Sequence, residues 1–449
     1  MPTHRILAAV LLLSLFACTA HEPPKPRPNL LFVSIDTLRA DHLGCYGYHR
    51  PTSPNIDALA ARSVLFEHAE SASSWTLPSL TALMTGLSVT GHNCDHLGSR
   101  LDPSYTTLAE LLRDAGYDTQ IVASHLFLGA PYGLQQGFTH VDTSVVQEEN
   151  DITSPDVTRL GLEWLRNKSA VHDGVPWMLW LHYFDPHAPY LAHEGVSGRF
   201  GVESDLDRYD GEIAYTDRYV GELLDELARS PQAQNTIVVL VADHGEEFGE
   251  HGNFGHGYAL HEECVHVPLV LHVPGIAPRR VSDLVPTIDL LPTLLELCRV
   301  PLRHEIEGQP MTPLLWGEPL PAQLAISEVR WMAGQDLRCV RVDRWKYIEG
   351  ATSAGPLVQL FDLDTDPAEN CDVHAAQAER SAALHERLEG RLRDARRIAG
   401  EHHQIGESQA SPSEMRAMEN TGYAGEGSGG VPKKKNEEPQ PAQPKEPPK

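Results

Sequence analysis

Four apolar runs along the chain each end in polar residues. Residues 29–35 (NLLFVSI) precede Asp36, and residues 236–242 (TIVVLVA) precede Asp243 and His244. Continuous apolar runs of this length are typical of strands that are buried on both faces, as in a parallel sheet. The other two runs, 119–123 and 177–184, precede His125 and the group Asp185, Pro186 and His187. The pattern therefore predicts four buried strands with polar groups at their carboxyl ends.

Segments with the character of helices lie between these runs, at 104–115, 205–229 and 289–298. Strands that alternate with helices are joined by crossover connections, so they lie parallel in one sheet. Open sheets of this kind bind ligands beyond the carboxyl ends of their strands. Each polar residue taken alone is more simply a helix cap or a loop residue. Their joint placement favours a common site.

The pattern changes after about residue 320. Residues 338–348 and 358–363 indicate short antiparallel strands, and residues 375–396 indicate a helix. The predicted fold is α/β, with a large mainly parallel sheet flanked by helices and a small C-terminal antiparallel subdomain. We place the large domain at 29–320 and the subdomain at 321–398.

The two ends of the chain are expected to lie outside this fold. Residues 1–17 contain an apolar stretch of export-signal length that is short for a membrane span. The following LFAC run resembles a bacterial lipobox. Either Cys18 is acylated and anchors the protein to the membrane, or cleavage near Ala20 releases it. Both place the protein in the bacterial cell envelope. Residues 399–449 are rich in Pro, Lys and Glu and are predicted to be disordered.

Composition excludes one class of partner. The chain has 36 Lys and Arg residues against 62 Asp and Glu residues, a net charge of −26, which argues against nucleic-acid binding. The cysteines after Cys18 are scattered and form no CxxC pair of the kind that binds zinc. Export permits disulfides, but the spacing leaves their pairing open.

Residues 74–86, SWTLPSLTALMTG, carry the candidate nucleophile. The run resembles the sulfatase signature CxPSRxxxLxTG of the alkaline phosphatase superfamily, with Thr76 in place of the oxidisable cysteine and Leu80 in place of the arginine. Four further blocks occur in the family's order: SIDTLRADHLGCYG, FDPHAPY, VADHGEEFGEHG and FGHGYALHEECVHVPLVL. The resemblance covers residues 29–396.

The resemblance implies a site for one divalent metal ion. Carried over by position, its ligands are Asp36, Thr76, Asp243 and His244. Many sulfatases have a second aspartate where this chain has Thr37, and use calcium. One carboxylate fewer and one imidazole move the ligand set toward manganese or zinc, so calcium, manganese and zinc all stay open. A threonine hydroxyl is a weak nucleophile at neutral pH, so the metal would favour its alkoxide.

The resemblance also implies that His187 and His256 are catalytic, as contacts to the substrate and the leaving group. His256 stands where typical sulfatases carry a lysine, and histidine can donate a proton near neutral pH. His125 is a weaker candidate, and about half of the histidines between 244 and 272 are expected to be loop or packing residues. We expect Arg39 and Asp41 to pair with each other.

The threonine at the nucleophile position limits which reactions of the superfamily this chain can catalyse. Sulfatases proper oxidise a cysteine or serine to formylglycine, and Thr76 cannot form that aldehyde. A threonine is used instead by the phosphodiesterases and the phosphoethanolamine or phosphoglycerol transferases of the superfamily. The leading hypothesis is a metal-dependent hydrolase of phosphate esters or diesters, with sulfate esters as a second possibility. The expected substrate is an anionic ester, either a small molecule or a glycan or lipid headgroup.

Two alternatives belong to other function classes. Transferases of this type usually carry several transmembrane helices before the catalytic domain, whereas this chain has one export segment. A catalytically silent protein that binds an anionic ligand is the other alternative. Thr37, Leu80 and Ala123 favour it, because they depart from the family pattern, and the retained ligand set counts against it.

Overall fold

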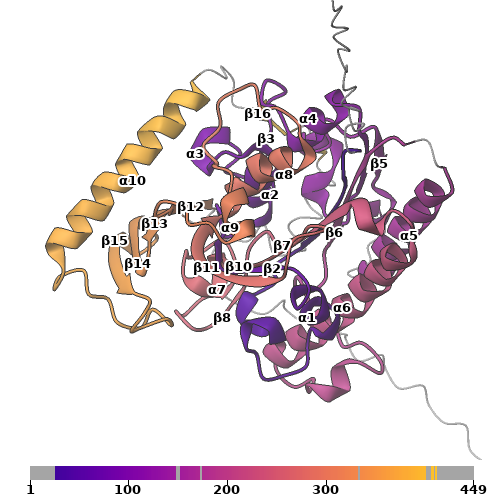
Figure 1. Ribbon diagram of the computed structural model, residues 1–449. Coiled ribbons are helices and arrows are strands. Elements are labelled where there is room, and N and C mark those ends of the chain that lie inside the picture. Colours follow the sequence, from indigo (N-terminus) through magenta and orange to yellow (C-terminus); the bar gives the residue numbers. More distant parts are fainter. Residues whose placement is uncertain are drawn as a thin grey trace, which may run out of the picture.

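The computed structural model describes residues 26–147, 152–171, 174–331, 334–400, 406–408 and 410–411. The predicted export segment, Cys18 and most of the predicted tail lie outside these ranges. A central sheet of eight strands has the order β11-β2-β10-β7-β1-β6-β4-β5 (Figure 1). Its strands are β1 Asn29–Ile35, β2 Val64–Glu70, β4 Asp118–Val122, β5 His140–Asp142, β6 Trp177–Tyr183, β7 Thr236–Ala242, β10 His266–His272 and β11 Arg279–Pro286.

The centre of this sheet is parallel and buried, as the apolar runs predict. β1 lies between β6 and β7 and is parallel to both, with Ile35 opposite Tyr183 on one side and Ala242 on the other. Every residue of these three strands is buried. Because the three strands end at one level, the residues that follow them leave the sheet at the same edge. The antiparallel partner of β7 is β10, which the sequence reading did not identify as a strand.

Helices cover both faces of the sheet. Figure 1 shows α1, α5 and α6 on one side and α2, α4 and α8 on the other. Their bounds are α1 Pro54–Ala60, α2 Thr76–Thr85, α3 Val89–His92, α4 Leu108–Asp114, α5 Ser154–Ala170, α6 Asp205–Arg229, α7 Glu262–Val265, α8 Leu290–Cys298 and α9 Thr312–Trp316. The predicted helix at 104–115 begins four residues late, because Thr107 and Glu110 form a capping box that fixes its first turn.

A second, four-stranded antiparallel sheet follows, with the order β12-β13-β14-β15. It comprises β12 Leu324–Trp331, β13 Gln335–Val342, β14 Trp345–Thr352 and β15 Gly355–Asp362, and α10 Ala378–Ala399 lies along it (Figure 1). Leu384, Leu388 and Leu392 of α10 pack with Val340 and Leu360 of the sheet. The predicted fold class is therefore confirmed, and the exact domain limits remain a prediction.

Two pairs of two-residue strands are also present: β3 Ser99–Arg100 pairs with β16 Gly406–Glu407, and β8 Glu247–Phe248 pairs with β9 Phe254–Gly255. Within the described ranges every helix is too short or too polar to cross a bilayer. The cysteines in these ranges are all unpaired.

Candidate active site

The ends of β1 and β7 and the start of α2 converge on one enclosed point. The Thr76 Oγ1 atom lies 3.2 Å from His244 Nε2. The same nitrogen lies 3.5 Å from Asp36 Oδ1 and 3.6 Å from Asp243 Oδ2. All four side chains are buried. The structure thus brings together the four residues that the sequence analysis proposed as metal ligands.

Three oxygens around this point have no hydrogen-bond partner among the described residues. They are Asp36 Oδ1, Asp243 Oδ2 and Thr37 Oγ1, and all are buried. Burial raises the pKa of Asp36 and of Asp243 well above the usual aspartate value, and Asp36 raises that of Asp243 further. Buried carboxylate oxygens without a hydrogen-bond partner are rare because their desolvation is costly. A bound cation removes this cost, so these oxygens fit a divalent metal ion.

The His244 ring is held in the tautomer that a metal ligand needs. Its Nδ1 donates to the Gly245 carbonyl oxygen at 2.8 Å. Burial, together with the charge of His256, holds the pKa of His244 well below its ordinary value, so the ring is neutral. The Nε2 lone pair therefore faces the carboxylates of Asp36 and Asp243. A neutral imidazole whose second nitrogen donates to a backbone carbonyl is the usual form of a histidine ligand.

His182 supports this site and was missed by the sequence analysis. It lies inside β6 and its Nε2 is 3.3 Å from Asp36 Oδ2. Its Nδ1 lies 2.8 Å from Ser34 Oγ, and the Trp180 indole donates to the same oxygen at 2.8 Å. Burial lowers the pKa of His182 to about 4, so the ring is neutral. The available signal was a single histidine inside an otherwise apolar strand.

His256 carries the positive charge at the site, through a partner that the sequence analysis also missed. Its Nδ1 donates to Glu246 Oε1 at 2.9 Å, and the Tyr190 hydroxyl donates to the other Glu246 oxygen at 2.8 Å. Burial lowers the pKa of His256, but Glu246 raises it by more, and the net pKa lies above the ordinary value. The His256 ring centre lies 4.6 Å from that of His244. The raised pKa favours the protonated form of His256, whose ring faces the proposed metal site.

Comparison with known proteins identifies the family. The sulfatase family profile matches residues 28–300, and the profile of the N-sulphoglucosamine sulphohydrolase C-terminal region matches residues 249–397. The chain belongs to the sulfatase family. It is accordingly an ester hydrolase of the alkaline phosphatase superfamily, as predicted, and the silent binding protein is not retained.

The similarity to individual relatives is low in sequence identity but extends over most of each chain. Arylsulfatase K of Gallus gallus is 25% identical over 453 residues, which cover 82% of this chain and 83% of that protein. Choline-sulfatase of Rhizobium meliloti (strain 1021) is 25% identical over 428 residues, covering 76% of this chain and 81% of that protein. Among solved structures, a phosphonate monoester hydrolase of Agrobacterium radiobacter has a TM-score of 0.71 at 20% identity, covering 82% of this chain and 96% of the other.

The other two histidines singled out for this sulfatase-family site lie beside it. His187 stacks on Phe184, and its ring centre is 4.9 Å from that of His256. Burial, together with the charge of His256, holds the pKa of His187 well below its ordinary value. His125 lies further back, 6.2 Å from His187, and its Nδ1 accepts the backbone N–H of Phe127 at 3.1 Å. His125 thus has a capping role of its own, which agrees with its weaker candidacy.

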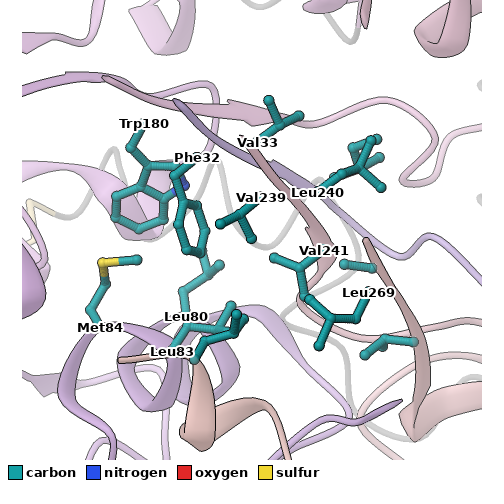
Figure 2. Close-up of a cluster of buried hydrophobic side chains, with 14 of the residues drawn as sticks. Phe32, Val33, Leu80, Leu83, Met84, Trp180, Val239, Leu240, Val241 and Leu269 are labelled. Carbon is teal, nitrogen blue, oxygen red and sulfur yellow. The ribbon is translucent and has the colours of Figure 1, made fainter. Parts of the chain in front are cut away.

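Leu80 and Thr37, two of the positions that depart from the sulfatase pattern, differ in their structural roles. Leu80 is fully buried and packs in the core between α2 and the sheet, near Phe32, Leu83 and Met84 (Figure 2). It substitutes a core contact for a polar group. Thr37 has a left-handed backbone, φ 52°, which costs about 1–3 kcal/mol for a residue other than glycine. Strain of this kind persists where a site requires it.

The loop after β1 is fixed by the predicted pair. Arg39 donates to both carboxylate oxygens of Asp41, at 2.9 and 2.8 Å. The same guanidinium donates to the Glu246 carbonyl at 3.0 Å, and so it also ties this loop to the segment after β7. The expectation that Arg39 and Asp41 pair is confirmed.

Proposed function

We propose that this protein hydrolyses monoanionic esters, phosphate diesters foremost, with Thr76 as the nucleophile and a divalent metal ion held by Asp36, Thr76, Asp243 and His244. One observation carries the proposal. The Thr76 hydroxyl is the only alcohol among these four side chains, and it lies 3.2 Å from a neutral imidazole nitrogen that faces two buried carboxylates. A bound metal would favour the alkoxide and neutralise charge on the ester oxygens.

The charges of the site favour a substrate with a single negative charge. Asp36, Asp243 and the Thr76 alkoxide contribute three negative charges, of which one divalent ion cancels two. Glu246 and protonated His256 cancel each other at 2.9 Å. The remaining nearby histidines are neutral, because burial lowers the pKa of His125, His182 and His187. A phosphate diester or a sulfate monoester adds one negative charge, whereas a phosphate monoester adds a second one in a buried site.

The side chains define a two-step displacement. Thr76 reacts in its deprotonated form, its hydroxyl proton having been released to solvent before the first turnover, and its Oγ forms a bond to phosphorus while the bond to the leaving alcohol breaks. His256 gives its proton to the departing oxygen. Neutral His256 next accepts a proton from water as that water attacks phosphorus and releases Thr76. Glu246 stabilises the imidazolium in each cycle and holds the ring in place.

The identity of the nucleophile favours phosphate esters over sulfate esters as substrates. Thr76 cannot become a formylglycine, so the route by which an aldehyde hydrate expels sulfate is closed to it. The resemblance to threonine-dependent phosphodiesterases supports phosphorus. Arylsulfatase K and choline-sulfatase, which the chain resembles at 25% identity, keep sulfate esters as the competing substrate class.

Mass spectrometry after brief exposure to substrate tests this proposal. A diester leaves one of its two alcohols on phosphorus, so the adduct mass on Thr76 should change with the alcohol that is retained. If sulfate esters leave an adduct of constant mass on Thr76 and phosphate diesters leave none, the substrate class is sulfate esters instead. Turnover without any adduct on Thr76, or turnover by Thr76→Ala, would overturn it. Product analysis with an added alcohol acceptor distinguishes hydrolysis from transfer.

We also propose that the mature protein resides in the bacterial cell envelope, held there by acylated Cys18. The LFAC run supports this placement. Replacing Cys18 with Ala should move the protein from the membrane fraction to the soluble periplasmic fraction. An unchanged distribution would leave ordinary cleavage near Ala20 as the explanation.

A further inference from the structure

A line of buried polar groups runs along one face of the central sheet and ends at Asp36. Ser34 of β1 lies directly opposite His182 of β6. Because side chains alternate between the two faces of a strand, Trp180 shares a face with His182, and Asp36 follows two residues after Ser34. All four residues are 0% exposed. Polar groups at this depth have no contact with solvent, so they bond to one another.

The chemistry of the donors fixes the direction of each hydrogen bond in this line. The Trp180 indole can only donate, and Ser34 Oγ accepts its N–H at 2.8 Å. The other partner of Ser34 Oγ in the described part of the chain is His182 Nδ1, at 2.8 Å. The Ser34 hydroxyl therefore donates to Nδ1, and the proton of the neutral His182 ring lies on Nε2. This nitrogen donates to Asp36 Oδ2 at 3.3 Å.

The opposite tautomer of His182 would leave two groups uncompensated. If Nδ1 donated to Ser34, the Ser34 hydroxyl would have no acceptor among the described residues, and the Nε2 lone pair would face a carboxylate oxygen. Both are costly in a buried site. The first donor is also held in place, because the Phe32 ring lies edge-on to the Trp180 ring with centres 6.0 Å apart (Figure 2). The line of hydrogen bonds thus begins in the packed core.

The hydrogen bond from His182 decides which oxygen of Asp36 is available to a metal ion. Oδ2 accepts from His182, whereas Oδ1 has no hydrogen-bond partner within the described ranges and lies 3.5 Å from His244 Nε2. Turning the carboxylate so that both oxygens reach one ion would break the bond to His182. Asp36 is therefore held as a ligand through one oxygen.

We propose that Trp180, Ser34 and His182 form a positioning chain that holds Asp36 as a one-oxygen ligand and so favours zinc over calcium. The proposal rests on the metal site of the proposed function. Calcium takes about six to eight oxygen ligands at roughly 2.3–2.6 Å and often uses both oxygens of a carboxylate. Zinc takes about four ligands at roughly 2.0–2.2 Å and binds imidazole readily, as His244 would offer it. His182 acts through Asp36 and is a positioning residue.

A different role for His182 must be separated from this one. Asp36, His182 and Asp243 each offer one ligand atom, and these atoms all lie within 4.8 Å of one another. His182 binds the ion itself only in the opposite tautomer. Nitrogen couplings in the pulsed electron paramagnetic resonance of the manganese-loaded protein count the imidazole ligands. One coupled nitrogen, from His244, supports the positioning role. Two coupled nitrogens, of which His182→Leu removes one, would overturn it.

Substitutions in the full-length chain test the positioning role. Ser34→Ala breaks the chain without touching Asp36, and His182→Leu removes the donor to Oδ2. His182→Gln keeps an N–H donor. Tyr183→Phe is the matched control, because Tyr183 lies on the opposite face of β6 and its hydroxyl bonds to Thr158 Oγ1 at 2.7 Å. Ser34→Ala removes one oxygen atom and covers the case in which His182→Leu fails to fold.

Calorimetric titration with zinc and with calcium is the measurement. Ser34→Ala and His182→Leu should each weaken zinc binding by about tenfold and calcium binding by less, so the ratio of the two affinities falls. The ratio for His182→Gln should lie between those of the parent and His182→Leu, and Tyr183→Phe should keep the parent ratio. A ratio unchanged in Ser34→Ala and His182→Leu would overturn the proposal. A parent that binds neither ion would reject the metal site itself, and with it the proposed function.

Discussion

Two buried charged groups in this molecule differ in how their charges are compensated. At the junction between the two sheets, Lys346 lies 2.9 Å from Glu262 and 3.2 Å from Glu369. Arg341 lies 3.0 Å from Glu262 and 3.4 Å from Glu70. Although burial opposes charge on Lys346, these carboxylates hold its pKa well above the usual value. This junction cluster supplies its own cations.

The site around Thr76 is also buried, but its protonated histidine, His256, is paired with Glu246, and within the described residues no lysine or arginine forms an ion pair with Asp36 or Asp243. Asp36 and Asp243 each have an oxygen without a hydrogen-bond partner among the described residues, and burial raises the pKa of both. Burial with unequal compensation separates a structural cluster from a functional one. The chain supplies the cation itself at the junction and, in our account, binds one from solution at the active site.

The largest expected effect is the loss of catalysis without a loss of stability. Thr76→Ala should lower kcat by about 10⁴-fold or more, because the covalent intermediate cannot form. Its free energy of unfolding should change little. Steady-state kinetics and denaturant unfolding measure the two quantities. Ser79→Ala is the control, since the Ser79 hydroxyl donates to the Ser73 carbonyl at 2.9 Å and has no part in the reaction. Similar loss of activity in both variants would contradict the assignment.

A substitution in the junction cluster should lower stability without lowering kcat. Lys346→Ala leaves the buried Glu369 without its partner and Glu262 with Arg341 alone, and should lower the free energy of unfolding by about 3–5 kcal/mol. The kcat of the fraction that stays folded should be close to that of the parent. Denaturant unfolding and active-site titration check this. If Lys346→Met, which keeps most of the packing, is equally destabilised, the effect comes from the lost charge, and a smaller loss in Lys346→Met shows that packing contributes to the effect of Lys346→Ala. A stability unchanged in both variants would contradict the comparison.

Neutralising an active-site carboxylate should raise the stability of the metal-free protein, whereas removing a charge from the junction cluster lowers stability. Without metal, Asp36→Asn should raise the free energy of unfolding by about 1–3 kcal/mol, because it removes a buried charge that His182, at 3.3 Å, compensates only in part. Added divalent metal should stabilise the parent and not the variant. Thermal unfolding with and without manganese, zinc or calcium measures both effects. Destabilisation of the metal-free variant would show that Asp36 is already compensated.

A smaller effect concerns the pH dependence set by Glu246. Because the pKa of His256 is raised, its acid form is present below that pKa and is lost as pH rises through it. Activity should therefore fall on the alkaline side. Glu246→Gln removes the anion and should move this alkaline limb to lower pH by about one unit. A profile of kcat/KM against pH measures the shift, and an unmoved limb would exclude His256 as the proton donor.

Much of the site could be predicted from the sequence, because strand ends in a parallel sheet meet at one edge. Asp36, Asp243 and His244 follow apolar runs directly, and the resemblance identified Thr76. Glu246 and His182 were missed for physical reasons. His182 lies within a strand that is buried on both faces, and Glu246 meets Tyr190 only after a long loop folds back. Contacts between distant loops leave no periodicity in the sequence.

The fold was predicted with the same strengths and gaps. The parallel strands beside β1 were recognised from continuous apolar runs, whereas β2, β10 and β11 were not. In β2 and β11 the buried pattern is broken by half-buried or exposed residues, and β10 runs antiparallel to its neighbours without a hairpin partner in sequence. Their pairing is fixed by the tertiary fold, which local pattern does not encode.

Anomalous diffraction from crystals grown with manganese tests the central claim most directly. The account predicts a strong peak within bonding distance of Asp36, Asp243, His244 and the Thr76 oxygen, at the point that the unpartnered carboxylate oxygens face. A peak only elsewhere, with these four side chains unchanged and no density between them, would contradict it.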